Sequence, residues 1–236
     1  MFGYMIGPLT RGDRMRSFYR GSTLLLIGIL CRCSGVDSDG LGPQYPLTVV
    51  TPPGYDSTRS YPMILFLHGL LIGYEGSAIT FGPVEYATSH EDFPCIVVAP
   101  QTTEGWDLEI LLRVLEEVAR DYSIDESRIY LTGMSTGGDW TWKLAVALPD
   151  TFAAIAPVSA GGDLEDLDPC RIAQVPVWAF HNAGDPIYPV ENTQALIKAL
   201  DACGGQTALT IYPSGAHDAW TETYANPVLY AWFLAH

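Results

Sequence analysis

Residues 128–138 read RIYLTGMSTGG, an apolar strand pattern that runs directly into G-x-S-x-G and is followed by a helical pattern. Glycines at 133 and 137 leave out the Cβ atoms that would collide in so tight a strand-to-helix turn. We therefore expect Ser135 to be held in strain with its Oγ above the sheet. The helix that follows would direct its N-terminal N–H groups toward whatever is bound at that oxygen. The stretch predicts a nucleophilic serine.

G-x-S-x-G alone is a weak signal, and the order of residues downstream strengthens it. Asp185 follows an apolar strand pattern at 177–180, and His217 follows another at 208–212. A serine, an acid and a histidine in this order, each on a loop after a successive strand, predict a triad of Ser135, Asp185 and His217. Three other acids follow the strand before and compete for the role of Asp185: Asp163, Asp166 and Asp168.

Strand and helix patterns alternate from about residue 45 onward, which is typical of an α/β fold whose mostly parallel sheet carries helices on both faces. Strands are expected at 45–51, 63–67, 95–99, 129–132, 153–158, 177–181 and 208–212. Helices are expected at about 106–121, 137–148, 190–202 and 222–235. Inserted segments are too short for a large lid domain. The site is therefore expected to be fairly open.

Composition narrows the classes of partner. The chain has 236 residues, 48% of them hydrophobic, with neither a linker nor a repeat, so one catalytic domain over 36–236 is expected. The formal net charge of −15, with only 12 Lys and Arg residues, argues against nucleic acid as a partner. No cysteine or histidine cluster has metal-ligand spacing, and the patterns imply no metal and no cofactor. Oligomeric state stays open.

Residues 1–35 differ from the rest and resemble an export signal, because Arg14, Arg16 and Arg20 precede the apolar run at 24–30. That run is too short for a stable membrane span. Cys31 or Cys33 after this run suggests processing as a lipoprotein, although the residues just before them, Leu30 and Arg32, do not fit a lipobox. The protein is expected to be secreted or in the cell envelope, periplasmic or lipid-anchored, and cytoplasmic if the run is not processed. An oxidising compartment could pair Cys170 with Cys203.

Four separated motifs resemble one superfamily: YPMILFLHG at 61–69, YLTGMS at 130–135, VPVWAFH at 175–181 and GAHDAW at 215–220. From about Pro43 onward the chain looks like a small α/β-hydrolase of the esterase and polyhydroxyalkanoate-depolymerase-like branch, related to catalytic domains of the prolyl-oligopeptidase type. This resemblance implies an α/β-hydrolase fold and a serine carboxylesterase that forms an acyl-enzyme. It also implies an oxyanion hole formed by the backbone N–H groups of Thr136 and Leu70.

Leu70 stands where relatives often carry a small residue, so it is expected, with Leu71, to narrow the acyl side. Trp106 and Trp220 are candidates for lining the acyl or alcohol side, and a plain core role is equally open for each. Asp139 replaces a residue that is commonly aromatic or glycine in relatives. It suits the N-terminal dipole of its helix and is assigned no catalytic role.

The expected activity is hydrolysis of short- to medium-chain carboxylic esters, on a small molecule or on a polymer. A serine peptidase of the prolyl-oligopeptidase type and an esterase of polyesters or xylan side chains are alternatives. A non-catalytic binding module with the same fold is a third, which the intact Ser135, Asp185 and His217 disfavour.

Overall fold

A computed structural model describes residues 29–32, 45–70, 79–162, 164 and 167–236. Within these ranges the strands form one eight-stranded sheet in the order β1-β2-β4-β3-β5-β6-β7-β8. The neighbouring strands from β4 to β8 in this order pair in parallel. Strand β2 pairs antiparallel with β4, and β1 pairs antiparallel with β2. The strands are β1 (Ile29–Arg32), β2 (Leu47–Val50), β3 (Tyr61–Leu67), β4 (Ile96–Pro100), β5 (Ile124–Met134), β6 (Ala154–Val158), β7 (Val177–Asn182) and β8 (Thr207–Tyr212).

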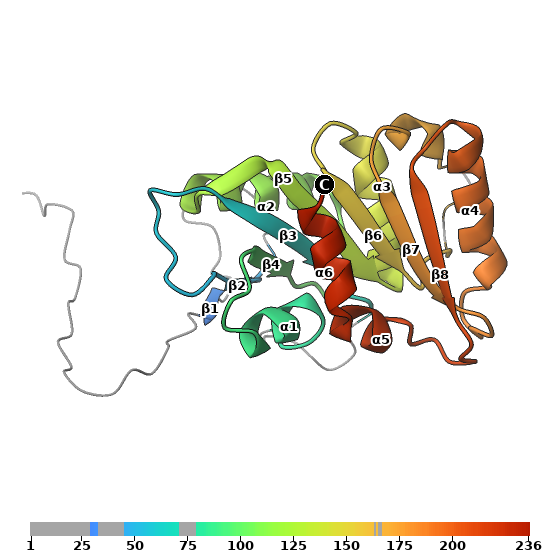
Figure 1. Ribbon diagram of the computed structural model, residues 1–236, viewed down its shortest axis with the longest axis horizontal. Helices are drawn as coiled ribbons and strands as arrows, with labels where there is room; N and C mark the ends of the chain where they lie inside the picture. The colour runs from blue at the N-terminus through green and yellow to red at the C-terminus, as the bar shows by residue number, and fades with distance from the viewer. Residues whose placement is uncertain (1–28, 33–44, 71–78, 163, 165–166) are drawn as a thin grey trace, which may run out of the picture.

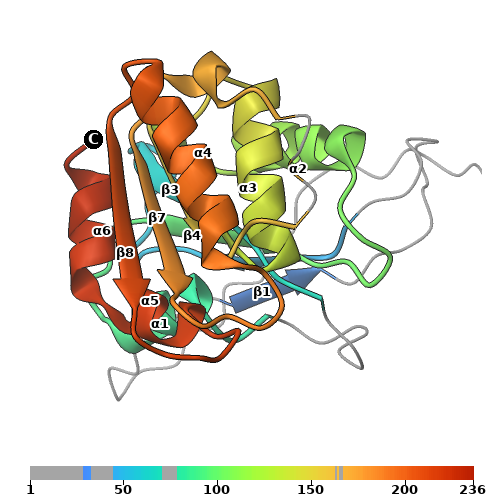
Figure 2. The ribbon, with the colours of Figure 1, turned by 90° about the vertical axis from the view of Figure 1, so that its right-hand side faces the viewer.

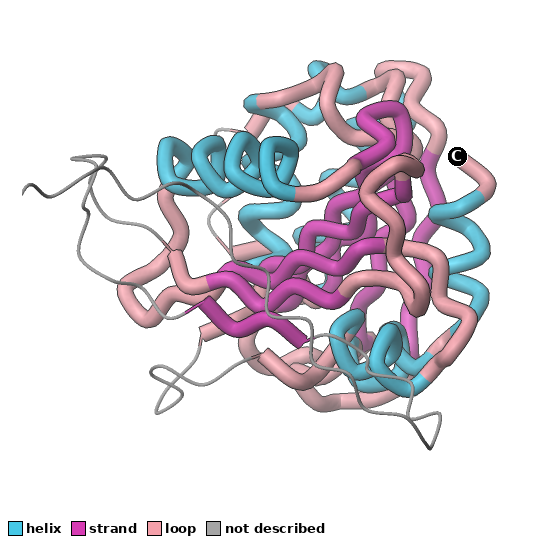
Figure 3. The backbone as a smooth tube through the Cα atoms, turned by 90° about the vertical axis from the view of Figure 1, so that its left-hand side faces the viewer, coloured by secondary structure: helices cyan, strands magenta, loops and turns pink. Residues whose placement is uncertain are grey.

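Helices cover both faces of the twisted sheet (Figure 1). Figure 2 shows three of them side by side over one face: α2 (Leu108–Asp121), α3 (Thr136–Ala147) and α4 (Val190–Ala202). The other face carries α1 (Pro83–Ser89), α5 (Trp220–Ala225) and α6 (Pro227–Leu234). Seen from the opposite side, the strands lie between these two helical layers (Figure 3). The predicted α/β architecture is confirmed.

Each helical layer buries its own apolar cluster against the sheet, which is why the central strands are apolar on both faces. Under α2, α3 and α4 the core includes Leu65, Leu111, Leu144 and Ile197. Under α1, α5 and α6 it includes Ile64, Phe66, Val84, Tyr224 and Leu229. All seven residues of β3 are buried, so the strand that leads to the predicted oxyanion loop lies in the middle of the core.

The C-terminal helix was expected to be continuous over 222–235, and this was wrong. Asn226 ends α5 in an extended conformation, and its side chain accepts a hydrogen bond from the N–H of Val228 at 3.0 Å. Pro227 then begins α6, because proline fits the first turn of a helix but not its interior. Helix α1 was not predicted. Its seven residues are too few for a clear helical period.

The pairing of Cys170 with Cys203 and the export signal at 1–35 have different outcomes in the structure. Cys170, in the short 3-10 helix η1 (Pro169–Ile172), forms a disulfide with Cys203 after α4, and their Cα atoms are 5.4 Å apart. Residues 29–32, within the segment expected as an export signal, pair with β2 as strand β1. The rest of 1–35 lies outside the described residues, so the signal stays a prediction. No helix in the described ranges combines the length and apolar character needed to span a bilayer.

Candidate active site

Ser135 lies at the turn between β5 and α3, at the carboxyl edge of the sheet. Its backbone has φ 54° and ψ −123°, a region that residues with a side chain rarely adopt. Two neighbouring glycines make this turn possible. A Cβ on Gly133 would lie 2.3 Å from the carbonyl oxygen of Gly137, and one on Gly137 would lie 2.0 Å from that of Leu67. The strained turn expected from the sequence is therefore present.

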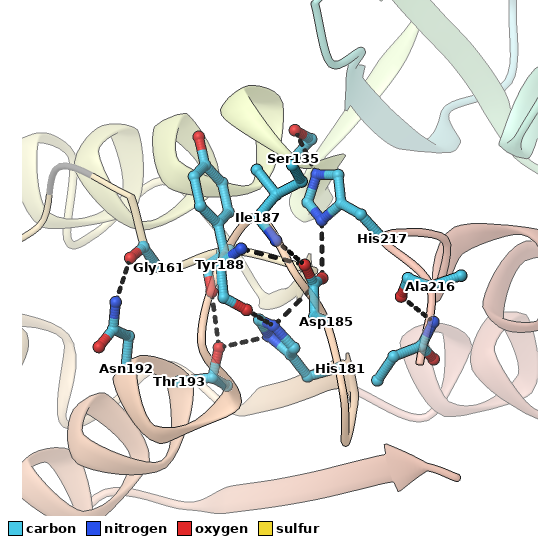
Figure 4. Close-up of polar contacts among 12 residues, drawn as sticks. Ser135, Gly161, His181, Asp185, Ile187, Tyr188, Asn192, Thr193, Ala216 and His217 are labelled. Atoms are coloured by element: carbon cyan, nitrogen blue, oxygen red, sulfur yellow. Dashed lines mark hydrogen bonds and ion pairs between the residues drawn. The ribbon is translucent and has the colours of Figure 1, made fainter. Parts of the chain in front are cut away.

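The loops after β7 and β8 bring Asp185 and His217 to Ser135. His217 Nε2 lies 2.9 Å from Ser135 Oγ, and His217 Nδ1 lies 2.6 Å from Asp185 Oδ2. Because a carboxylate only accepts, Nδ1 carries the hydrogen and Nε2 is left to accept from the serine hydroxyl. Figure 4 shows this series of contacts.

Asp185 is buried and fully hydrogen-bonded. Its Oδ1 accepts the N–H groups of Ile187 at 2.9 Å and Tyr188 at 3.0 Å, and its Oδ2 also lies 3.5 Å from Nε2 of the buried His181. Burial alone would raise the pKa of Asp185, but the bonds from His217, Tyr188 and Ile187 together hold that pKa below its usual value. The carboxylate is therefore ionised at neutral pH.

Of the competing acids, Asp168 is exposed and caps η1 by accepting from the N–H of Cys170 at 3.1 Å. Asp163 and Asp166 lie outside the described residues. Asp218, next to His217, accepts from the N–H and the hydroxyl of Thr221 at the start of α5. Only Asp185 among the described acids is hydrogen-bonded to His217.

The loop after β3 lies directly beside Ser135, since a Cβ on Gly69 would be 3.1 Å from Ser135 Cβ. His68 fixes this loop: its Nε2 accepts from Thr102 N at 3.0 Å, so its Nδ1 donates to Gly69 O at 2.5 Å. Burial lowers the pKa of His68, which keeps the ring neutral. In a trans peptide the C=O and N–H point in opposite directions, so the N–H of Leu70 points away from His68.

The predicted substrate residues have different surroundings. Trp106 donates its indole N–H to His68 O at 3.2 Å and packs against the imidazole ring of His68, so it supports the loop after β3. Trp220 meets His217 edge-on, with ring centroids 5.1 Å apart. The Leu70 side chain is 70% exposed, and Leu71 lies outside the described residues.

A hollow of about 580 Å³ opens beside the site, between α1 and α5. Trp220 and Met134, which precedes Ser135, connect it to the site. Its remaining lining combines three Phe and Tyr rings with small, polar and acidic residues: Phe81, Tyr86, Tyr224, Gly82, Ala225, Ser89, Thr221, His90 and Glu85. Among the described residues, no group of three or more His, Cys, Asp or Glu side chains is arranged to hold a metal ion.

Tyr188 was not identified from the sequence, although it contacts Ser135, Asp185 and His217. Its N–H donates to Asp185 Oδ1, its ring lies edge-on to that of His217 with centroids 5.3 Å apart, and its hydroxyl interacts with the side chains of Ser135 and Asp139. Burial raises the pKa of Tyr188 to about 12. The signal in the sequence that could have led to Tyr188 was Asp139, because a carboxylate on the side of a helix that faces the sheet requires a partner.

Comparison with known proteins agrees with this geometry. The profile of the dienelactone hydrolase family matches residues 97–229. A probable feruloyl esterase C of Aspergillus terreus is 28% identical over 193 residues, which cover 72% of this chain and 70% of the relative. A thermostable esterase of known structure is 28% identical with a TM-score of 0.70, over 88% of this chain and 62% of the other.

A feruloyl esterase module from Clostridium thermocellum shares the fold, with a TM-score of 0.59 and 20% identity over 80% of this chain and 81% of the module. The family match, the fold and these relatives agree with one another. This chain belongs to the dienelactone hydrolase family and is a carboxylester hydrolase with the α/β-hydrolase fold.

Proposed function

We propose that the chain hydrolyses carboxylic esters through a Ser135–His217–Asp185 triad and a covalent acyl-enzyme. The observation that carries the proposal is the pair of contacts at 2.9 Å and 2.6 Å that joins the three side chains. His217 takes the proton of Ser135 as Oγ attacks the ester carbonyl, and Asp185 stabilises the imidazolium that forms. His217 then returns the proton to the departing alcohol.

The negative charge that develops on the carbonyl oxygen needs two N–H donors near Ser135. We assign these to Thr136, the first residue of α3, and to Leu70. The fixed orientation of the Gly69–Leu70 peptide supports the second assignment, because His68 holds Gly69 O and turns the Leu70 N–H the other way. The N-terminal dipole of α3 favours the same charge.

The acyl group is proposed to be short to medium in length. An aromatic acid is a second candidate, favoured by the hollow of about 580 Å³ next to Met134, whose lining includes the rings of Phe81, Tyr86, Trp220 and Tyr224. Rings stack on such walls, while a straight alkyl chain gains only area. A polymer-linked ester fits as well, because Leu70 after β3 and Ile187 after β7 are exposed apolar side chains on loops of the site. Nothing described here selects an amide.

Two measurements test the proposal. Ser135→Ala should lower kcat for ester hydrolysis on the order of a million-fold, and a fluorophosphonate probe should label the wild-type protein at Ser135 alone. Hydrolysis by Ser135→Ala within tenfold of wild type would refute the mechanism.

A panel of substrates then identifies the acyl group. It contains p-nitrophenyl esters from acetyl to octanoyl, a hydroxycinnamate methyl ester and an aminoacyl anilide. A short-chain site gives a maximum between acetyl and butyryl and a steep fall by octanoyl, since each methylene in a closed pocket changes binding by about 1–3 kcal/mol. A higher kcat/KM for the hydroxycinnamate would identify the aromatic acid instead.

A further inference from the structure

Asp139 is a buried carboxylate next to the hydroxyl of Tyr188. Its side chain is 5% exposed, and Oδ1 accepts the N–H groups of Gly161 at 2.7 Å and Gly162 at 3.1 Å. The hydroxyl of Tyr188 interacts with the same carboxylate. Burial raises the pKa of Asp139, and these three donors oppose that shift. A carboxylate only accepts hydrogen bonds, so Tyr188 can act only as a donor toward Asp139.

The two side chains are closely packed. A Cβ added to Gly162 would lie 2.6 Å from Asp139 Oδ2 and 2.8 Å from Tyr188 Oη, so both atoms border the same small space. Tyr188 is also fixed through its backbone, whose N–H binds Asp185 and whose carbonyl lies 2.9 Å from His181 Nε2. Figure 4 shows its ring rising from the Asp185 loop on the same side as Ser135 and His217. These backbone bonds hold the Tyr188 ring against His217.

We propose that Tyr188 Oη, its hydrogen held by Asp139, positions the water that hydrolyses the acyl-enzyme. This inference rests on the proposed triad. The attacking water has two hydrogens, one of which must point at His217 Nε2. Tyr188 lies against the His217 ring and beside Ser135 Oγ, so its oxygen can accept the other. A water bonded at both hydrogens directs a lone pair at the acyl carbon.

In this step the water oxygen forms a bond to the carbonyl carbon while His217 Nε2 takes one water proton. The bond between that carbon and Ser135 Oγ then breaks, and His217 returns the proton to Oγ. The products are the free carboxylic acid and Ser135 with its hydroxyl restored. Tyr188 accepts a hydrogen bond from the second water hydrogen, takes no proton, and ends the step unchanged.

Methanol tests the proposal, because it has one hydroxyl hydrogen and can give it only to His217. With p-nitrophenyl acetate and added methanol, the acyl-enzyme partitions between acetate and methyl acetate. Tyr188→Phe removes the acceptor for water and leaves methanol unaffected. The ratio of methyl acetate to acetate should therefore rise roughly tenfold, the effect of one lost hydrogen bond.

The matched control is Tyr55→Phe. Its hydroxyl also makes one hydrogen bond, accepting from Ser123 N at 2.8 Å, but the residue lies before β3, at the opposite end of that strand from Gly69. This variant should keep the wild-type product ratio. An unchanged ratio in Tyr188→Phe would overturn the proposal, and so would slower p-nitrophenol release without a change in ratio, which would place Tyr188 in acylation.

Asp139→Asn provides a second test of the proposal. An asparagine whose oxygen accepts from Gly161 and Gly162 presents its N–H₂ to Tyr188, so Tyr188 must turn its own hydrogen toward the water. The product ratio should rise as in Tyr188→Phe, and the double variant should be no worse than either single one. If Asp139→Asn does not fold, Tyr188→Phe decides alone. Failure of the triad would appear separately, as hydrolysis retained by Ser135→Ala.

Discussion

The backbone of Ser135 shows how individual residues hold the site in place. A non-glycine residue at φ 54° costs about 1–3 kcal/mol, and the surrounding hydrogen bonds must hold it there. Ser135 N donates to Val158 O, and Ser135 O accepts from Asp139 N, both at 3.0 Å. These two bonds belong to β6 and α3. The position of Ser135 is therefore fixed by the sheet and the helix together.

Asp185→Asn should lower kcat about 10⁴-fold while the protein stays folded. An amide in place of the carboxylate can donate its N–H₂ to His217 Nδ1, which puts the ring in the tautomer that cannot accept from Ser135. Ester hydrolysis together with a thermal melt measures both effects. Asp168→Asn is the control, because that side chain caps η1 at the surface. A larger loss of kcat in the control than in Asp185→Asn would assign the acid to the earlier loop.

Among individual residues, the sequence predicts the position of those that come directly after a strand. Ser135, Asp185 and His217 each come directly after an apolar run, so their meeting at one edge of a parallel sheet could be expected. Tyr188 and Asp139 could not be paired in this way. They lie on different elements, and only the packing of the loop after β7 over the start of α3 brings them together.

Among the elements, the disulfide has the most direct consequence. The bond between Cys170 and Cys203 has a sequence separation of 33 and encloses β7, the Asp185 loop and α4. Closing a loop of this size stabilises the folded state by about 3–4 kcal/mol in the chain-entropy view. A Cys170→Ser, Cys203→Ser double variant should melt several degrees lower, with ester hydrolysis unchanged at low temperature.

Differential scanning calorimetry with and without reductant checks this. Reductant should lower the Tm of the wild-type protein and leave that of the double variant unchanged. Cys95 cannot substitute as a partner, because it is buried and its thiol pKa is raised to about 12. Equal melting temperatures in all four samples would mean that the bond adds nothing to stability.

Elements with a strong pattern were predicted and short ones were not. Seven strands and the helices α2, α3 and α4 correspond to the expected segments, because apolar runs between turn residues and amphipathic periods are local properties. The length of β5 was underestimated, since its first residues are half-exposed and polar and are held by pairing with β3. Strand β1 falls in a run whose arginine-flanked composition indicates export instead.

For the whole molecule, the export prediction can now be tested against a defined alternative. A chain expressed with residues 1–35 should be shortened on export, and a chain beginning at Val36 should be soluble and fully active. Such processing would remove β1 and leave β2 at the edge of the sheet. Intact mass spectrometry of the exported protein measures the first outcome. An unshortened N-terminus, with a lower Tm for the chain that begins at Val36, would make β1 part of the mature fold.

The strand order divides the sheet between two halves of the chain. Strands β1 to β4 occupy one side and β5 to β8 the other, and they join where β3 pairs with β5. The exposed residues Thr103 and Glu104 lie between the halves in sequence. A polypeptide cut there would leave Ser135, Asp185 and His217 on one fragment and the Gly69–Leu70 peptide on the other. Such fragments, each fused to one of two interacting proteins, would form an enzyme-fragment complementation reporter in which ester hydrolysis signals that β3 has docked on β5.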